Sequence, residues 1–214
     1  SYFLRGFYPD ESAEYINDSF INKKLFKFGS ELKISFMSNL MEDKGIVEFI
    51  ESAISLREEN NIKIEVFIAG AIIENSSERL KIALKKATNK SYINFLGLVN
   101  GKEKWELLSK TDIFVLPTYY KTEALPLSLI EAMRFGCLCI SSNIGEINEL
   151  LKDDRGIIID KVNTKNLLDA IKLAIKDDKS SKSKMKNSFK YADKNFSYNF
   201  YKDNLKDIIE RHID

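Results

Sequence analysis

The stretch Thr-Glu-Ala-Leu-Pro-Leu-Ser-Leu-Ile-Glu-Ala-Met, residues 122–133, says more about fold and function than any other part of this 214-residue chain. It follows a short apolar run, residues 112–116, that is typical of a buried strand. Pro126 suits the first turn of a helix, because its fixed φ and missing amide hydrogen do no harm there. Leu127 and Ile130 then begin an apolar stripe with the helical period, so we expect this helix to pack on a sheet.

Two carboxylates stand out in this stretch: Glu123 precedes the helix, and Glu131 is expected two turns inside it, on the apolar face. A carboxylate there needs a partner, because an unpaired buried charge costs several kcal/mol, and a ligand rich in hydroxyls would serve. Eight helical residues span at most roughly 12 Å, about the ribose-to-sugar length of a nucleotide sugar. Between the two acids, the helix N-terminus offers free amides to a phosphate. The alternative is that Glu123 caps the helix and Glu131 forms a surface ion pair.

The same stretch resembles the Glu-x7-Glu motif of retaining, family 4 (group 1) glycosyltransferases with the GT-B fold, in their C-terminal, donor-binding domain. Other segments resemble further motifs of this family, in the same order along the chain. They are the strand and pyrophosphate-binding turn at 36–45, the base-contacting turn at 95–99, the Glu-Ala-x-x-x-Gly continuation that ends at Gly136, and the Gly-Gly-x-x-Glu turn at 142–149. The resemblance covers about residues 30–200, and several ordered motifs are far more specific than one.

The resemblance implies a role for each matching residue. Lys44 and Glu123 are expected to be catalytic, with Lys44 stabilising charge on the leaving pyrophosphate and Glu123 contacting the donor sugar. The remaining donor-binding residues are expected to be Asn39, Gly45, Leu98, Val99, Leu127 and Glu131. Among them, Glu131 would accept hydrogen bonds from the ribose hydroxyls, and the Leu127 amide would donate to phosphate. The family generally works without a metal, so no metal and no other cofactor is expected.

Three positions depart from the family pattern. Asn39 stands where the family usually has an Arg, Ser38 replaces the preceding Gly, and Glu146 replaces the second Gly of the later turn. An Asn side chain can donate a hydrogen bond but lacks the bidentate cationic fork of Arg. We therefore expect phosphate binding to be weaker, or to depend more on Lys44.

The composition is that of an ordinary globular domain, with 44% hydrophobic and 30% charged residues. Lys and Arg (33) nearly balance Asp and Glu (32), which argues against a nucleic-acid partner. The single histidine, His212, lies near the end of the sequence, so hydrolase triads are excluded. Cys137 and Cys139 are expected to be reduced, buried thiols, because a Cys-x-Cys pair without a nearby histidine is poor zinc spacing.

Short apolar runs alternate with helical patterns, which is the rhythm of βαβ units. Strands are expected at 33–37, 63–69, 92–96, 113–116, 138–141 and 156–159, and helices at 45–59, 77–88, 102–110, 126–135, 145–151, 164–176, 182–194 and 198–211. We predict an α/β fold with a Rossmann-like open parallel sheet of about six strands and helices on both faces, which is one half of a GT-B glycosyltransferase. Lys44, Leu98, Glu123 and Gly145 would then meet at the rim where such sheets bind ligands.

Three parts are expected along the chain: an N-terminal extension or linker remnant (1–30), the nucleotide-sugar-binding domain (31–180), and C-terminal helices that pack on it (181–214). Residues 3–9 resemble the short strand by which the family leaves its N-terminal domain. The chain therefore looks like a donor half, which should bind without efficient transfer. Trp105 is expected in the core, and the aromatic residues at 189–201 are expected to anchor the terminal helices.

The leading hypothesis is an enzyme that transfers a hexose-type sugar from a UDP- or GDP-sugar to a glycan or lipid-linked acceptor in cell-surface polysaccharide synthesis, with a missing N-terminal domain binding the acceptor. Asn39 and Glu146 favour an alternative, a catalytically silent nucleotide-sugar sensor or scaffold. A nucleotide-sugar epimerase half is a second alternative, but the chain lacks that enzyme's His-containing acid/base pair.

The expected location is cytoplasmic, because no segment resembles a signal peptide or a membrane span. Peripheral contact with the inner face of the membrane is an alternative, because the Lys-rich stretch at 176–194 could touch anionic lipid. A solvated helix is the commoner meaning of such a run.

Overall fold

The computed structural model describes residues 31–73 and 76–210, together with residues 12, 15, 16, 20, 21 and 24. Within these residues, parallel strands form a six-stranded sheet in the order β3-β2-β1-β4-β5-β6. The strands are β1 (Leu32–Met37), β2 (Ile64–Ala69), β3 (Ile93–Gly97), β4 (Ile113–Leu116), β5 (Leu138–Ser142) and β6 (Ile157–Ile159). The predicted strands and their bounds are confirmed to within one residue. The predicted strand-like segment at 3–9 lies outside the described residues.

The connecting helices are η2 (Glu42–Lys44), α2 (Ile46–Glu58), α3 (Glu78–Thr88), α4 (Gly101–Lys110), α5 (Leu127–Arg134), α6 (Ile147–Leu151), α7 (Thr164–Lys176), α8 (Asp178–Phe196) and α9 (Tyr198–Glu210). Most follow the predicted pattern closely. The exception is α8, which begins at Asp178 rather than Lys182. The reason is a cap: the Asp177 side chain accepts a hydrogen bond from the Ser180 amide, which starts the helix one turn earlier.

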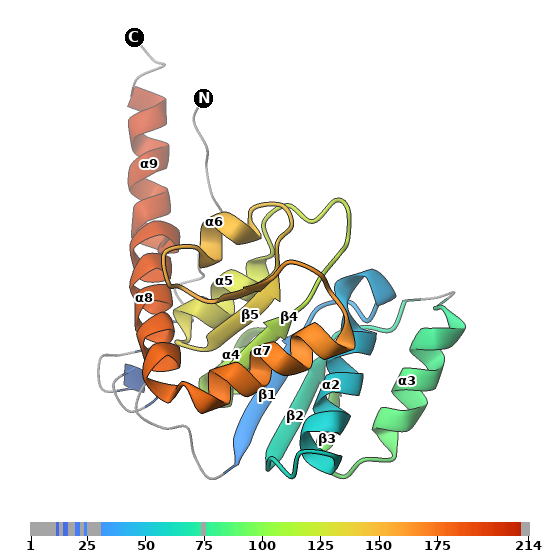
Figure 1. Cartoon of the computed structure of the whole chain (residues 1–214). Coiled ribbons are helices and arrows are strands. Elements are labelled where there is room, and N and C mark those ends of the chain that lie inside the picture. The colour runs from blue at the N-terminus through green and yellow to red at the C-terminus, as the bar shows by residue number, and fades with distance from the viewer. Residues whose placement is uncertain are drawn as a thin grey trace.

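The direction in which successive strands are added reverses between β1 and β4, and this determines which helices cover each face of the sheet. Crossovers between parallel strands are right-handed, which puts α2 and α3 on one face and α5 and α6 on the other. After β6, α7 returns to the first face and packs against α2. Figure 1 shows α7 and α2 crossing the near face of the sheet, with α8 and α9 forming a rod at one side. The predicted fold, a Rossmann-like sheet covered on both faces, is confirmed.

Apolar strands make the core, as the sequence predicts. All four residues of β4 are buried, and the rings of Trp105 and Phe135 stack at 5.6 Å between centroids, which joins α4 to the end of α5. Trp105 is thus a core residue. Cys137 and Cys139 are buried free thiols, also as predicted.

The aromatic residues near the C-terminus divide into two groups. On α8, Phe196 is buried and contacts Tyr191 edge-on, while Phe189 packs against the core. On α9, Tyr198 and Phe200 are exposed. The predicted anchoring of the terminal helices is therefore confirmed for α8 and wrong for this part of α9, because α9 extends beyond the elements that α8 packs against (Figure 1).

Candidate functional site

The chain leaving β1 turns sharply and packs against the loop that follows β4. Lys44 ends η2, and Gly45 follows with φ +76°, a conformation that favours glycine. A Cβ atom at Gly45 would lie 2.1 Å from the carbonyl oxygen of Pro117. The Tyr119 amide donates to the Asp43 carbonyl at 2.7 Å. These contacts fix the turn to the start of the β4–α5 loop.

The far end of the same loop is held by the turn after β5. Gly145 has φ +52°, and a Cβ atom there would lie 2.0 Å from the Glu123 carbonyl oxygen. The Glu146 amide donates to the Ala124 carbonyl at 2.9 Å. Glu146 acts here through its backbone, and its φ of −82° needs no glycine, so this departure from the family pattern leaves the turn unstrained. Both ends of the loop are thus fixed, and Glu123 lies just before α5.

Lys44 and Glu123 form an ion pair where these two segments meet. Lys44 Nζ donates to Glu123 Oε2 at 2.7 Å, and the two side chains are 14% and 10% exposed. The Lys44 ammonium also lies 4.5 Å from the centroid of the Tyr120 ring, which adds a cation–π contact. The two residues predicted to be catalytic are therefore in direct contact.

Glu131 is paired in a similar way, with a lysine from another helix. Its Oε1 accepts a hydrogen bond from Lys104 Nζ at 2.6 Å. Burial raises the pKa of Glu131, and the bond and charge of Lys104 act against that rise. Lys104 in turn lies over the Trp105 ring, 4.2 Å from its centroid. The carboxylate thus has the partner that its burial requires.

A cavity of about 240 Å³ opens beside this second pair, at the carboxyl ends of β1, β2 and β3. The predicted residues that line it are Asn39, Leu98, Val99 and Glu131, and they are joined by Ser38, Lys104 and Ser128. The turn predicted to contact the base and the carboxylate predicted to bind ribose therefore share one cavity with the first turn of α5. Lys44, Gly45, Glu123 and Leu127 do not line this cavity. The first three lie on the two segments next to the tip of α5, and Leu127 is the first residue of α5.

Two expectations about α5 are corrected. The helix begins at Leu127, so Glu131 lies one turn inside it rather than two. Leu127 was expected in the apolar stripe, but its side chain is 57% exposed. It occupies the first helical position, where the chain has not yet turned toward the core, and the packed stripe is made by Leu129, Ile130 and Met133 instead.

Lys104 and Ser128 are lining residues that the sequence analysis missed. The one available signal was the need of a buried Glu131 for a cation, and that signal does not say which lysine supplies it. Ser128 sits in the first turn of α5, where amides have no partner within the helix. Together with Glu131, this end of the cavity can accept hydrogen bonds from hydroxyls and donate them to an anion.

Within the described residues, no group of three or more His, Cys, Asp or Glu side chains lies in a position to hold a metal ion. No helix in the same ranges is both long and apolar enough to cross a membrane.

The motifs indicate a family relationship, and a comparison with known protein families confirms it. The family model described as glycosyl transferases group 1 matches residues 17–195. The chain belongs to this family. The match runs from before β1 to the end of α8, so it contains both acid–lysine pairs and the cavity.

Two relatives with assigned names are also glycosyltransferases. Over 146 residues the chain is 31% identical to N,N'-diacetylbacillosaminyl-diphospho-undecaprenol alpha-1,3-N-acetylgalactosaminyltransferase of Campylobacter jejuni, covering 68% of this chain and 36% of that protein. Over 137 residues it is 31% identical to the capsular polysaccharide biosynthesis glycosyltransferase CapH of Staphylococcus aureus, covering 62% and 37%. The chain thus spans a little over a third of the length of either relative.

Among solved structures, HepE of Anabaena in complex with UDP and glucose superimposes with a TM-score of 0.75. The alignment covers 96% of this chain and 55% of that one, at 16% identity. At that identity the likeness establishes the fold: this member of the family has the architecture of one half of a GT-B glycosyltransferase.

Proposed function

We propose that this chain is the donor-binding domain of a retaining glycosyltransferase that transfers a hexose-type sugar from a UDP- or GDP-sugar to a glycan or lipid-linked acceptor in cell-surface polysaccharide synthesis. The observation that carries the proposal is the cavity at the tip of α5, which Glu131 lines and beside which Lys44 meets Glu123. The names of the two curated relatives support the acceptor class, and the UDP complex of HepE supports the donor class.

Each part of a nucleotide sugar has a suitable partner around the cavity. The base would lie against the Leu98–Val99 turn, where Leu98 presents an exposed apolar side chain. The ribose hydroxyls would donate to the free oxygen of Glu131, since Lys104 is bound to the other one. A base at one end and a hydroxyl acceptor at the other fix the nucleoside in one orientation.

The diphosphate would then reach the tip of α5, where the Leu127 amide and Asn39 donate. Lys44 would serve the same phosphates, which compete with Glu123 for its ammonium group. As the bond to the sugar breaks, negative charge grows on the leaving diphosphate, and a fixed cation stabilises that charge more than the ground state. Glu123, released by Lys44, would accept hydrogen bonds from the sugar. No metal is needed in this scheme.

The test is titration calorimetry of the 214-residue chain with UDP, GDP and uridine, each with and without Mg²⁺. We expect a nucleoside diphosphate to bind equally well in both conditions. Glu131→Gln should weaken that binding by about 1–3 kcal/mol, because hydroxyls lose a charged acceptor. The matched control is Glu149→Gln, on the exposed Glu149–Lys152 pair, which should leave binding unchanged. Strict dependence of binding on Mg²⁺ would contradict the metal-free mechanism. Unchanged UDP affinity in Glu131→Gln would contradict the proposed donor site.

A silent sensor is the second candidate, and Asn39 favours it. Asn39 is exposed at the cavity and brings no positive charge to the position where the family usually has Arg. The two readings differ in turnover: an enzyme should slowly hydrolyse its UDP-sugar to UDP and free sugar, with water as the acceptor. The assay therefore uses the domain together with the proposed acceptor-binding domain: a protein that binds the donor there and yields no UDP above the rate of its Lys44→Ala variant is a sensor.

A further inference from the structure

A second cavity, of about 460 Å³, lies at the carboxyl ends of β4, β5 and β6. It shares no lining residue with the first cavity. Its walls come from the first turn of α2, the start of α3, and the loops after the three strands. Since none of the residues with a proposed donor role lines it, the donor site does not account for it.

Glu48 is the feature of this cavity that points to a ligand. The Glu48 side chain, in the first turn of α2, is 6% exposed and lines the cavity wall. Its Oε1 accepts from Arg79 Nη2 at 2.9 Å, whereas its Oε2 is buried and has no hydrogen-bond partner among the described residues. A buried carboxylate oxygen without a donor is costly, so this atom favours a ligand that brings an O–H or N–H group.

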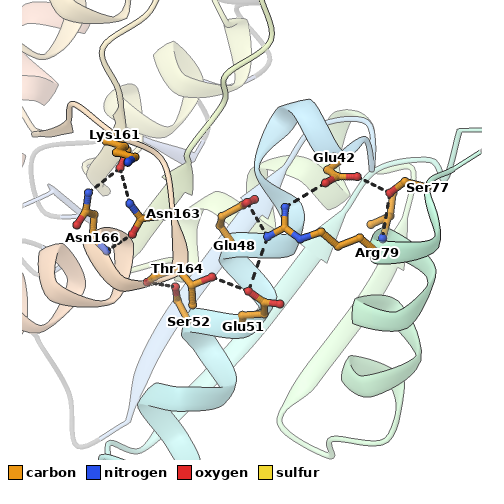
Figure 2. Close-up of polar contacts among 11 residues, drawn as sticks. Glu42, Glu48, Glu51, Ser52, Ser77, Arg79, Lys161, Asn163, Thr164 and Asn166 are labelled. Carbon is orange, nitrogen blue, oxygen red and sulfur yellow. Dashed lines mark hydrogen bonds and ion pairs between the residues drawn. The ribbon is translucent and has the colours of Figure 1, made fainter.

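Arg79 cannot serve an anionic ligand at the same place, because three carboxylates already surround it. Its guanidinium bonds Glu42 at 3.0 Å and Glu48 at 2.9 Å, and lies 3.9 Å from Glu51. Figure 2 shows the guanidinium between these acids, with Ser77 and Thr164 donating to the outer two. Three negative charges against one positive charge repel a phosphate or sulfate from this wall.

The rest of the lining combines neutral groups with one further carboxylate, Asp160, and one lysine, Lys161. Tyr119 is half-buried, and burial together with the charges of Glu48 and Glu42 raises its pKa to about 12, so its hydroxyl stays protonated. The exposed Asn143 amide lies 3.5 Å from the Asp160 carboxylate, and Lys161 follows on the same loop. An aromatic ring, an amide and carboxylates with free acceptor capacity are the groups that hold the faces and hydroxyls of a sugar ring.

We propose that this cavity binds a neutral sugar residue, with one of its hydroxyls donating to Glu48 Oε2 and its ring lying against Tyr119. The sugar has two sources that share this chemistry: a unit of a glycan, or the sugar carried by the nucleotide in the neighbouring cavity. The binding of a free glycan unit does not depend on the proposed donor function, because the two cavities have separate walls.

The test is a ¹H–¹⁵N NMR titration of the 214-residue chain with the methyl α-glycosides of glucose and N-acetylgalactosamine. We expect the amide signals of Tyr119, Asn143 and Lys161 to move, and those of Leu98 and Val99 to stay. UDP, in a separate titration, should move the second set alone. If UDP-glucose moves both sets while the methyl glycosides move neither, the sugar is that of the donor; if the glycosides suffice, it is a glycan unit.

Variants separate binding from folding. Glu48→Gln should weaken glycoside binding about tenfold, the scale of one hydrogen bond to a charged group, without altering UDP affinity. Asn143→Ala removes an exposed side chain and so keeps the test open if Glu48→Gln does not fold; we expect a loss of about threefold. Asn89→Ala, an exposed asparagine at the end of α3, is the matched control and should bind as the parent does.

Three outcomes would overturn the proposal: no movement of the Tyr119, Asn143 and Lys161 amides with any sugar or UDP-sugar, unchanged glycoside affinity in folded Glu48→Gln, or larger shifts of these amides with inorganic phosphate or spermidine than with sugars. Failure of UDP to move Leu98 and Val99 would instead contradict the donor site. The two proposals thus fail separately.

Discussion

The two acid–lysine pairs of the proposed donor site, Lys44–Glu123 and Lys104–Glu131, have similar bond lengths and burial but lie on different kinds of backbone. Lys44 Nζ meets Glu123 Oε2 at 2.7 Å, and Lys104 Nζ meets Glu131 Oε1 at 2.6 Å. The first pair joins a 3-10 turn to a loop, whereas the second joins two packed helices, α4 and α5. Because the loop backbone is fixed at both ends, the first pair can open only by rotation of its flexible side chains, whereas Lys104 also lies over the ring of the buried Trp105. The first pair is therefore suited to opening for a diphosphate, and the second to holding a carboxylate in one place.

The largest expected effect comes from disrupting the turn that holds Lys44 in the Lys44–Glu123 pair, which we call the loop-borne pair. Gly45→Ala should lower the free energy of unfolding by about 3–5 kcal/mol, because a left-handed φ is strained for alanine and the new Cβ atom meets Pro117. The control is Gly97→Ala: Gly97 has φ +67° but no heavy atom within 4 Å of the added Cβ, so we expect a loss of about 1–2 kcal/mol. Urea unfolding measures both, and equal losses would show that the contact with Pro117 is unimportant.

The second prediction concerns the Lys104–Glu131 pair, the helix-borne pair. Lys104→Met leaves Glu131 buried without its cation, so the free energy of unfolding at about pH 7 should fall by about 2–4 kcal/mol. Burial raises the pKa of Glu131 in the folded state, and loss of Lys104 raises it further. A raised folded pKa means that stability is greatest below the unfolded pKa and is lost as the pH rises through the folded pKa. The deficit of the variant should therefore shrink as the pH falls to about 4.

Lys102→Met is the control on the same helix. Lys102 lies 3.8 Å from Glu106, and both side chains are mostly exposed, so removing it should change little at any pH. Denaturant titrations of both variants across this pH range make the comparison. A pH-independent deficit in Lys104→Met would mean that lost packing on Trp105, rather than the unpaired buried charge of Glu131, is responsible.

The contrast between Lys44 and Lys104 also shows what the sequence can predict. Lys44 lies in a turn whose residues form a recognisable motif, so the sequence alone makes it a candidate site residue. Lys104 is one of three lysines on α4, and nothing in their pattern says which one meets Glu131. That choice depends on where α4 lies relative to α5, and the two helices are joined by the stacking of Trp105 on Phe135. Packing between segments far apart in the chain has no signal in the sequence around Lys104.

The fold was easier to predict, for the same reason. Each strand is a short apolar run that ends at polar or glycine residues, so its bounds are local properties of the sequence. Leu127 shows the limit of such reasoning. It continues an apolar pattern, yet the first residue of a helix points where the preceding chain directs it, and here that is toward solvent. Helical periodicity therefore predicts the buried face well inside a helix and poorly at its first turn.

The third prediction tests whether Lys44 opens toward phosphate. Lys44→Ala should weaken UDP binding by about 2–3 kcal/mol, the scale of a charge-assisted hydrogen bond, while uridine binding changes little. Lys86→Ala, on the exposed face of α3, removes the same charge far from the motif and serves as the control. Calorimetry with UDP and uridine on each variant gives the four affinities. Equal losses for UDP and uridine would mean that Lys44 supports the fold of the site and does not contact the diphosphate.

The smallest expected effect concerns the tip of α5, which both pairs flank. The proposed contact at Leu127 is its amide, so Leu127→Ala should leave UDP affinity unchanged, while Leu127→Pro should weaken it by about 1 kcal/mol by removing the donor. Proline is compatible with the first helical position, and Pro126 already has the extended ψ of 110° that a following proline requires. A Leu127→Pro variant that keeps its helix content, measured by circular dichroism, and binds UDP as tightly as Leu127→Ala would remove this amide from the phosphate site. The diphosphate would then depend on Lys44 and Asn39, and the loop-borne pair would carry the larger share of donor binding.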